Sequence, residues 1–180
     1  MPNVETGAPP YGLAVFNQLD AARAREELLA CCASRAFAER VAAGRPYSDT
    51  DALAAEAGRV LAELPWDDVL EALDAHPRIG ERPRGPGREA AWSRRGQAGT
   101  APADREVLEA LAAGNAAYEE RFGHVYLVCA AGLSAEELLR RLHARLDNDE
   151  ETERRIVREE LAAITRLRLA GLVAPPGGAR

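Results

Sequence analysis

The sequence predicts an all-α fold, a compact single-domain helical bundle of about eight helices. Alanine, leucine, glutamate and arginine dominate the composition, and these residues are strong helix formers. Helix start and stop signals recur at short intervals along the chain. Residues 125–130 form a short apolar run without a partner strand, and a lone strand cannot satisfy its backbone. We therefore expect a buried extended segment or the start of a helix there.

Capping residues and helix breakers set the expected helix boundaries. Asp20 and Ser34 are suited to cap two helices, and Ser134 with Glu137 forms a capping box. Pro65 and Gly123 end helices. The expected helices cover residues 21–32, 35–41, 50–64, 66–75, 89–98, 102–121, 135–146 and 150–172, with Pro102 in the first turn of its helix.

The chain length and its composition at the ends predict one domain between two tails. The 180 residues suit a single domain, which can bury a core without disulfides or metal. Residues 1–12 and 173–180 are rich in proline and glycine, so we expect flexible tails there. The helical domain is expected over residues 13–172.

Charge and cysteine content exclude several classes of protein. A net charge of −6 argues against a general grip on nucleic acid. The three cysteines are an odd number and suit a reducing compartment. No signal peptide and no apolar stretch of about 20 residues is present, so we expect a cytoplasmic protein that does not enter a membrane. Lysine is absent, which excludes a Schiff-base lysine.

His76 is the first candidate for chemistry. It ends an amphipathic helix directly before Pro77, which favours an extended backbone at the histidine. Histidine titrates near neutrality and suits proton transfer. The alternative is a histidine that only interacts with the helix dipole.

Polar and basic residues after the loop at 77–88 are candidates for binding an anion. These are Ser93, Arg94, Arg95 and Gln97, near the start of a helix whose dipole favours negative charge. The alternative is a solvated, arginine-rich surface.

Two arginines, three histidines and one cysteine are further candidates for binding or metal ligation. Arg145 and Arg168 lie among apolar neighbours and either extend to solvent or turn inward to bind a carboxylate. The spacing of the histidines His76, His124 and His143 matches no metal-ligand pattern, so we expect no metal. Cys129 is expected to be a small buried apolar residue.

The order of several short motifs carries a resemblance. The motifs are Phe16-Asn17, Arg45-Pro46, residues 71–80 with His76-Pro77-Arg78-Ile79-Gly80, Ser93-x-x-Gly96-Gln97, Asn115-x-x-Tyr118-x-x-Arg121-Phe122-Gly123, Arg145-Leu146-x-Asn148 and Arg166-Leu167-Arg168-Leu169. From about residue 13 to 172 the chain resembles the 2-oxo-4-hydroxy-4-carboxy-5-ureidoimidazoline (OHCU) decarboxylases.

The resemblance implies a function in urate breakdown. It implies an all-helical, homodimeric enzyme without a cofactor that binds a small-molecule substrate and releases (S)-allantoin. It makes His76 the proton-transfer residue, and Arg168 or Arg145 the group that binds substrate oxygen. The remaining substrate-binding candidates are Pro77 through its carbonyl, Ser93, Arg94, Arg95, Gly96, Gln97, Tyr126, Val128, Cys129 and Ala130.

One position departs from the family pattern, because Gly96 stands where the family has a glutamate that pairs with the catalytic histidine. Without a carboxylate partner His76 is less basic. Three interpretations remain open: Glu81 or Glu89 substitutes, the protein is an impaired or repurposed relative acting on another ureido or imidazole acid, or the change serves to trap a ligand. A non-catalytic helical binding module that uses its arginine-rich loop is the alternative from another class. His124 and Tyr126 replace phenylalanines of the family and make the pocket more polar.

Overall fold

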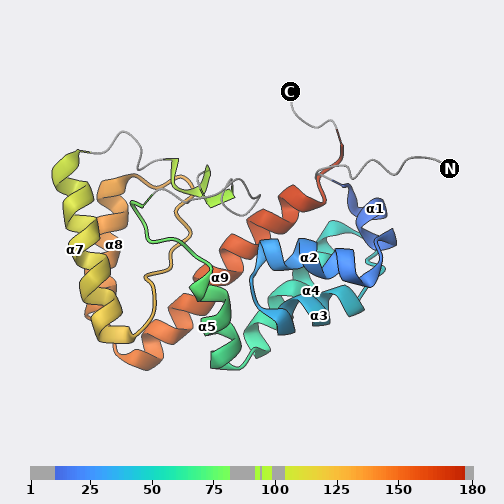
Figure 1. Ribbon diagram of the computed structural model, residues 1–180, viewed down its shortest axis with the longest axis horizontal. Helices are drawn as coiled ribbons and strands as arrows, with labels where there is room; N and C mark the ends of the chain where they lie inside the picture. The colour runs from blue at the N-terminus through green and yellow to red at the C-terminus, as the bar shows by residue number, and fades with distance from the viewer. Residues whose placement is uncertain (1–10, 82–91, 94, 99–103, 177–180) are drawn as a thin grey trace. The chain divides into compact units, whose positions relative to one another are not determined.

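The structure is a computed structural model that describes residues 11–81, 92–93, 95–98 and 104–176. These residues form helices and no strand, as predicted. The chain divides into two compact units, one of residues 1–64 with 165–180 and one of residues 65–164. Figure 1 shows the helices of each unit.

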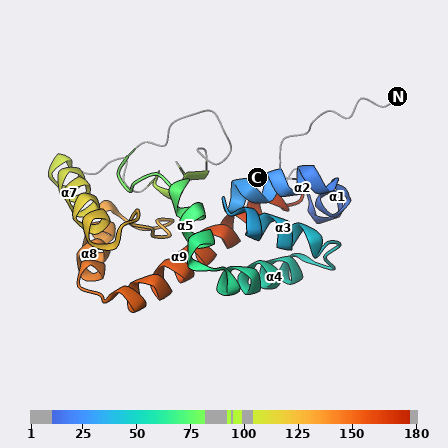
Figure 2. The same ribbon diagram turned by 60° about the horizontal axis from the view of Figure 1, so that its bottom comes forward.

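The first unit contains four short helices and the C-terminal end of a long one. The short helices are α1 (Leu13–Gln18), α2 (Ala21–Cys31), α3 (Arg35–Ala43) and α4 (Thr50–Glu63). The side chains of Asp20, Ser34 and Asp49 cap α2, α3 and α4 by accepting a hydrogen bond from the backbone N–H three residues later. In the two views of Figures 1 and 2, α2, α3 and α4 lie side by side.

Two motifs of the sequence hold this first unit together. The Arg45 guanidinium donates to the carbonyl oxygens of Phe16 at 2.8 Å and Leu19 at 2.7 Å, and its Nε donates to Ala42 O at 3.1 Å. Asn17 and Tyr47 exchange two hydrogen bonds of 2.9 Å between the amide side chain and the backbone. These bonds satisfy carbonyls at the ends of α1 and α3, so the Phe16-Asn17 and Arg45-Pro46 motifs have a structural role.

The edges of the two predicted tails are hydrogen bonded to each other. Tyr11 N–H donates to Leu172 O at 2.9 Å, and Gly12 N–H donates to Ala174 O at 3.1 Å. Val173 is buried. Residues 1–10 and 177–180 lie outside the described residues, so the tails and the domain bounds of 13–172 stay a prediction.

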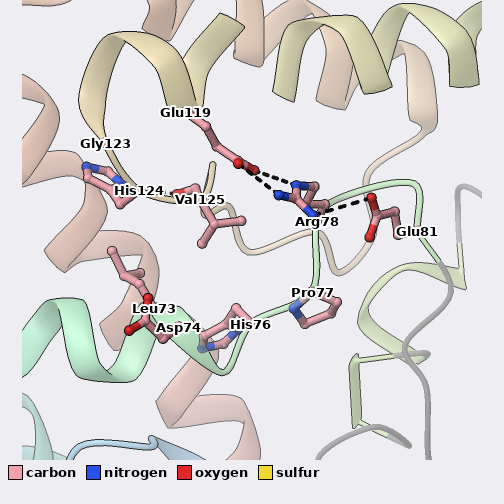
Figure 3. A pocket seen from close by; sticks show the side chains of 10 residues that line it. All are labelled: Leu73, Asp74, His76, Pro77, Arg78, Glu81, Glu119, Gly123, His124 and Val125. Atoms are coloured by element: carbon pink, nitrogen blue, oxygen red, sulfur yellow. Dashed lines mark hydrogen bonds and ion pairs between the residues drawn. The ribbon is translucent and has the colours of Figure 1, made fainter. Parts of the chain in front are cut away.

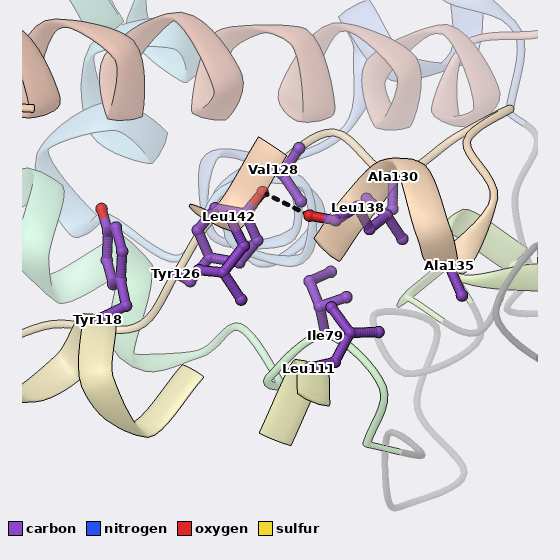
Figure 4. Packing of buried hydrophobic residues seen from close by; sticks show 9 residues of the cluster. All are labelled: Ile79, Leu111, Tyr118, Tyr126, Val128, Ala130, Ala135, Leu138 and Leu142. Carbon is purple, nitrogen blue, oxygen red and sulfur yellow. Dashed lines mark hydrogen bonds between the residues drawn. The ribbon is translucent and has the colours of Figure 1, made fainter. Parts of the chain in front are cut away.

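The second unit is built on α5 (Trp66–Asp74), α7 (Arg105–Phe122), α8 (Ala135–Leu146) and the first part of α9 (Glu150–Leu172). α7 and α8 pack side by side, and a Cβ on Gly114 would come within 2.5 Å of Leu142 Cδ2, so glycine allows this close approach. Figure 4 shows the core between them, which consists of Ile79, Leu111, Tyr118, Tyr126, Val128, Ala130, Ala135, Leu138 and Leu142.

Residues 125–130 cross this core without regular secondary structure, and residues 126–128 and 130 are buried. Side chains satisfy part of their backbone. Arg145 donates to Leu127 O from α8, and Cys129 N–H donates to Glu160 Oε2 of α9 at 2.7 Å. This confirms the expected buried segment, and it shows why no partner strand is needed.

A buried ion pair joins three helices to this segment. Arg145 donates through Nε to Glu153 Oε1 at 2.7 Å, and its guanidinium lies 4.8 Å from the Tyr126 ring centroid. Tyr118 of α7 donates to the same carboxylate, and Asn148 Nδ2 donates to Glu153 Oε2 at 2.9 Å. Burial raises the pKa of Glu153, but these donors together hold the pKa below its ordinary value. Glu153 is therefore ionised at neutral pH.

The helix predictions hold for most of the chain, with three differences. α1 was not expected as a separate helix, because its N-cap residue Gly12 offers no side-chain cap. α7 begins at Arg105 rather than 102, and Pro102 lies outside the described residues. Of the expected helix 89–98, Trp92, Ser93, Arg95 and Gly96 are helical, and 89–91 and 94 lie outside the described residues.

Replacing Glu153 tests the buried ion pair. Glu153→Gln leaves the Arg145 guanidinium buried without its counter-charge, and we expect a loss of about 3–5 kcal/mol in the free energy of unfolding. Urea denaturation measures it. Glu151→Gln, an exposed position on the same helix, is the control and should change stability by less than about 0.5 kcal/mol. A loss below about 1 kcal/mol for Glu153→Gln would contradict the assigned role.

Because of the Glu153 carboxylate, we expect the native protein and Glu153→Gln to differ in how their stability changes in acid. Because the folded-state pKa of Glu153 lies below its ordinary value of 4.5, its contribution is present above that pH and is lost as pH falls through the folded-state pKa. Below pH 4.5 the native protein should lose stability more steeply than Glu153→Gln. Parallel loss in both proteins, measured by urea denaturation at a series of pH values, would rule this contribution out.

Candidate active site

His76 follows the end of α5. The helix begins after Pro65, carries Asp67 and Asp68 in its first turn where the dipole favours them, and ends at Asp74. His76 N–H donates to Leu73 O at 2.9 Å, which continues the last turn. Val69, Ala72 and Leu73 are buried and fix this end of the helix. The imidazole thus stands on a rigid element, as a proton-transfer group requires.

A cavity of about 430 Å³ adjoins His76 (Figure 3). This volume is within the range of ordinary small-molecule sites, about 300–1,000 Å³. Its lining comes from the end of α5, the loop after it and the end of α7. The lining residues are Leu73, Asp74, His76, Pro77, Arg78, Glu81, Glu119, Gly123, His124 and Val125.

An ion pair forms one wall of this cavity. Arg78 Nε and a terminal nitrogen donate to the two Glu119 oxygens at 2.6 and 2.9 Å, and Glu81 lies 3.7 Å from the same guanidinium. The hydrogen bonds from Arg78 lower the pKa of Glu119, so this carboxylate is ionised at neutral pH. Figure 3 shows both contacts on the side of the cavity opposite Leu73 and Asp74.

A second imidazole lines the same cavity. The His124 ring has edge-on contacts with Trp66 and Tyr118, at centroid distances of 5.6 and 5.5 Å, and a tilted contact with Phe122. Its Nδ1 lies 3.1 Å from Val125 O, which favours the tautomer with the proton on Nδ1. Aromatic packing accounts for this side chain, and the ring adds polarity to the cavity, as expected from the sequence.

Gln97 connects the predicted binding segment to the loop after His76. Gly80 N–H donates to Gln97 Oε1 at 3.0 Å, and Asn115 Nδ2 of α7 donates to Ile79 O at 2.8 Å. The structure therefore brings Gln97 to the His76 loop. Ser93 is buried and Arg95 is exposed, whereas Arg94 lies outside the described residues.

The space beside Gly96 is open. A Cβ built there would have nothing within 4 Å. Glycine is thus not needed for packing, and a glutamate at this position would fit. Glu81, one of the two carboxylates proposed to substitute, lines the cavity of His76, while Glu89 lies outside the described residues.

The other predicted binding residues lie at different places. Tyr126, Val128 and Ala130 are buried in the core, and Cys129 is half-buried. Arg145 is occupied by Glu153 and Leu127 O. Arg168 is buried in the other unit, with a guanidinium nitrogen 3.5 Å from Ala30 O. Substrate contacts by these residues stay a prediction.

Sequence reasoning did not single out several residues that line the cavity. These are Asp74, Arg78, Glu119 and Val125. Arg78 and Glu119 lie 41 positions apart, so no local pattern pairs them. Both lie inside motif segments, 71–80 and 115–123, and that was the available signal. Among the described residues no group of three His, Cys, Asp or Glu side chains is suited to hold a metal ion. No described helix is long and apolar enough to cross a membrane.

Comparisons with known proteins agree with the resemblance. The family model described as OHCU decarboxylase matches residues 17–170. The OHCU decarboxylase of Amia calva is 33% identical over 141 residues, 77% of this chain and 81% of the relative. The uric acid degradation bifunctional protein TTL of Arabidopsis thaliana is 30% identical over 151 residues, 82% of this chain. The chain spans only 46% of that relative's length.

Solved structures show the same fold. A crystal structure of OHCU decarboxylase in the presence of (S)-allantoin superposes with a TM-score of 0.73 at 28% identity, covering 83% of this chain and 99% of that one. A crystal structure of (S)-allantoin synthase, at 18% identity and a TM-score of 0.70, supports the fold alone. Because the family model matches most of the sequence, the chain belongs to the OHCU decarboxylase family.

Proposed function

We propose that this chain is a carboxy-lyase that converts 2-oxo-4-hydroxy-4-carboxy-5-ureidoimidazoline to (S)-allantoin, with His76 as the proton-transfer residue. The observation that carries the proposal is the match to the family over residues 17–170, which includes the His76 cavity. The proposal extends to a cytoplasmic homodimer without a cofactor. The dimer and the lack of a cofactor rest on the resemblance alone, and the compartment rests on the cysteine content and the other sequence features given above.

The reaction needs little from the protein beyond orientation and a proton. The bond between the ring carbon and the carboxylate breaks, CO2 leaves, and the electron pair passes into the substrate's conjugated imine. A proton is then delivered to the neighbouring ring carbon, the former imine carbon that bears the ureido group, and the hydroxyl on the decarboxylated carbon loses its proton to become the carbonyl. An imidazole positioned on one side of the carbon delivers the proton to one face, which gives a single stereoisomer.

Two arginines are candidates for holding the substrate carboxylate, Arg145 and Arg168. Arg145 already donates to Glu153 and to Leu127 O, and removing it would leave a buried carboxylate unpaired. This supports a structural role for Arg145, and the binding of substrate oxygen by Arg168 rests on the resemblance alone.

Because Gly96 stands where the family has a glutamate, the second candidate is that the chain is an impaired or repurposed relative of the decarboxylases. Glu81 is the described alternative to the missing glutamate, but its side chain is 60% exposed and lies near Arg78. Such a carboxylate is a weaker partner for an imidazole than a buried one. If a repurposed site binds another ureido or imidazole acid, that compound will raise the melting temperature.

Replacing His76 tests the proposed reaction. We expect His76→Gln to lower the rate of (S)-allantoin formation by about 100-fold or more, because positioned acid–base groups contribute about 10²–10⁴. The rate is followed by circular dichroism with freshly generated substrate. His143→Gln, an exposed histidine on α8, is the control and should keep its rate. Equal rates for His76→Gln and the native protein would refute the role of His76.

Replacing Gly96 tests whether the absence of the family glutamate limits the rate of the reaction. Gly96→Glu should raise kcat by about tenfold or more, because the restored carboxylate makes His76 more basic. Gly96→Gln, of the same size but without charge, is the matched control and should bring no gain. If Gly96→Glu is no faster than Gly96→Gln, another group already supplies the carboxylate. If every variant is folded and inactive, the repurposed candidate replaces the decarboxylase.

A further inference from the structure

The loop after His76 contains a tight turn with a defined peptide orientation. Glu81 N–H donates to Arg78 O at 3.1 Å, which closes a four-residue turn. Gly80, its third residue, has φ of +89°, and no non-glycine residue of the described chain has a positive φ. A turn with positive φ at the third residue alone is of type II, and it requires glycine there.

Type I and type II turns differ by a flip of the peptide between their two central residues. Here that peptide joins Ile79 to Gly80. Its carbonyl accepts a hydrogen bond from Asn115 Nδ2 at 2.8 Å, and its N–H donates to Gln97 Oε1 at 3.0 Å. Two side-chain amides therefore hold both polar groups of one peptide.

The two side-chain amides come from different parts of the chain, and both stabilise the same orientation of the Ile79–Gly80 peptide. Asn115 is buried in α7, and Gln97 belongs to the segment of residues 95–98. A flipped peptide would turn its carbonyl away from the Asn115 donor and its N–H away from the Gln97 acceptor. Both bonds would be lost together, so they favour the type II form cooperatively.

We propose that Gln97 and Asn115 are positioning residues that fix the Ile79–Gly80 peptide and, through it, the His76-Pro77-Arg78 segment at the cavity. Through its side-chain oxygen Gln97 acts on the loop backbone, a role beyond the substrate contact that the resemblance implies. The effect on catalysis rests on the proposed function, whereas the effect on the loop does not.

Two substitutions of Gln97 separate these roles. Gln97→Glu keeps an acceptor oxygen for Gly80 N–H but loses the amide donor, and Gln97→Ala loses both. We expect Gln97→Ala to lower kcat by about five- to tenfold, the value of one hydrogen bond, and the Gly80 amide to report whether the acceptor oxygen kept in Gln97→Glu still holds the loop. Ala98→Ser, exposed in the same segment, is the control.

Hydrogen exchange at the Gly80 amide gives a readout without substrate. By NMR, its exchange rate should rise about tenfold in Gln97→Ala and stay near the native rate in Gln97→Glu. If Gly80 exchange rises as far in Gln97→Glu as in Gln97→Ala, or if it does not change in Gln97→Ala, the proposal is overturned. If the native protein forms no (S)-allantoin, the proposed function fails, and the exchange data still decide the role of Gln97.

Replacing the side-chain amide of Asn115 by a carboxylate is the same chemical change as Gln97→Glu, but we expect the opposite effect on the exchange rate of the Gly80 amide. Asn115→Asp removes the donor and places a carboxylate beside Ile79 O, so it should lower kcat and increase Gly80 exchange, unlike Gln97→Glu. An Asn115→Asp protein that matches the native exchange rate would contradict the proposal. If this variant does not fold, the two Gln97 variants decide the question by themselves.

Discussion

The buried pair of Arg145 and Glu153 is the interaction on which the second unit depends. Glu153 accepts hydrogen bonds from α7 through Tyr118, from α8 through Arg145 and from Asn148, and Arg145 also binds Leu127 O. Removing two charges from water costs several kcal/mol per ion, and only such a saturated set of partners offsets this cost. The pair fixes a segment without regular structure, residues 125–130, against three helices.

Most residues that carry the family resemblance serve structure in this way. Arg45 and Asn17 bind backbone groups at the ends of α1 and α3, and Arg145 and Asn148 meet at one carboxylate. Gly80 has the positive φ of a type II turn. His76 is different, because its side chain lines a cavity. The motifs thus contain residues that hold the fold together and a small region around His76 that lines the cavity.

The sequence predicted the helices well, because caps such as Asp20, Ser34 and Ser134 are local signals. It missed α1, which lacks such a cap. Of the candidate site, His76 and Pro77 line a cavity, and their roles toward the substrate stay a prediction. The pairing of Arg78 with Glu119, the contact of Gln97 with Gly80 and the burial of Arg145 were not predicted, because each depends on how distant segments pack.

We propose that the loop from His76 to Gly80 and its cavity form the substrate site despite the glycine at position 96. A crystal structure of this chain in the presence of (S)-allantoin tests it most directly. We predict the ligand against the His76 imidazole and the Pro77 carbonyl, with the Ile79–Gly80 peptide still bound by Asn115 and Gln97. Ligand bound away from His76, with this cavity empty, would contradict the account.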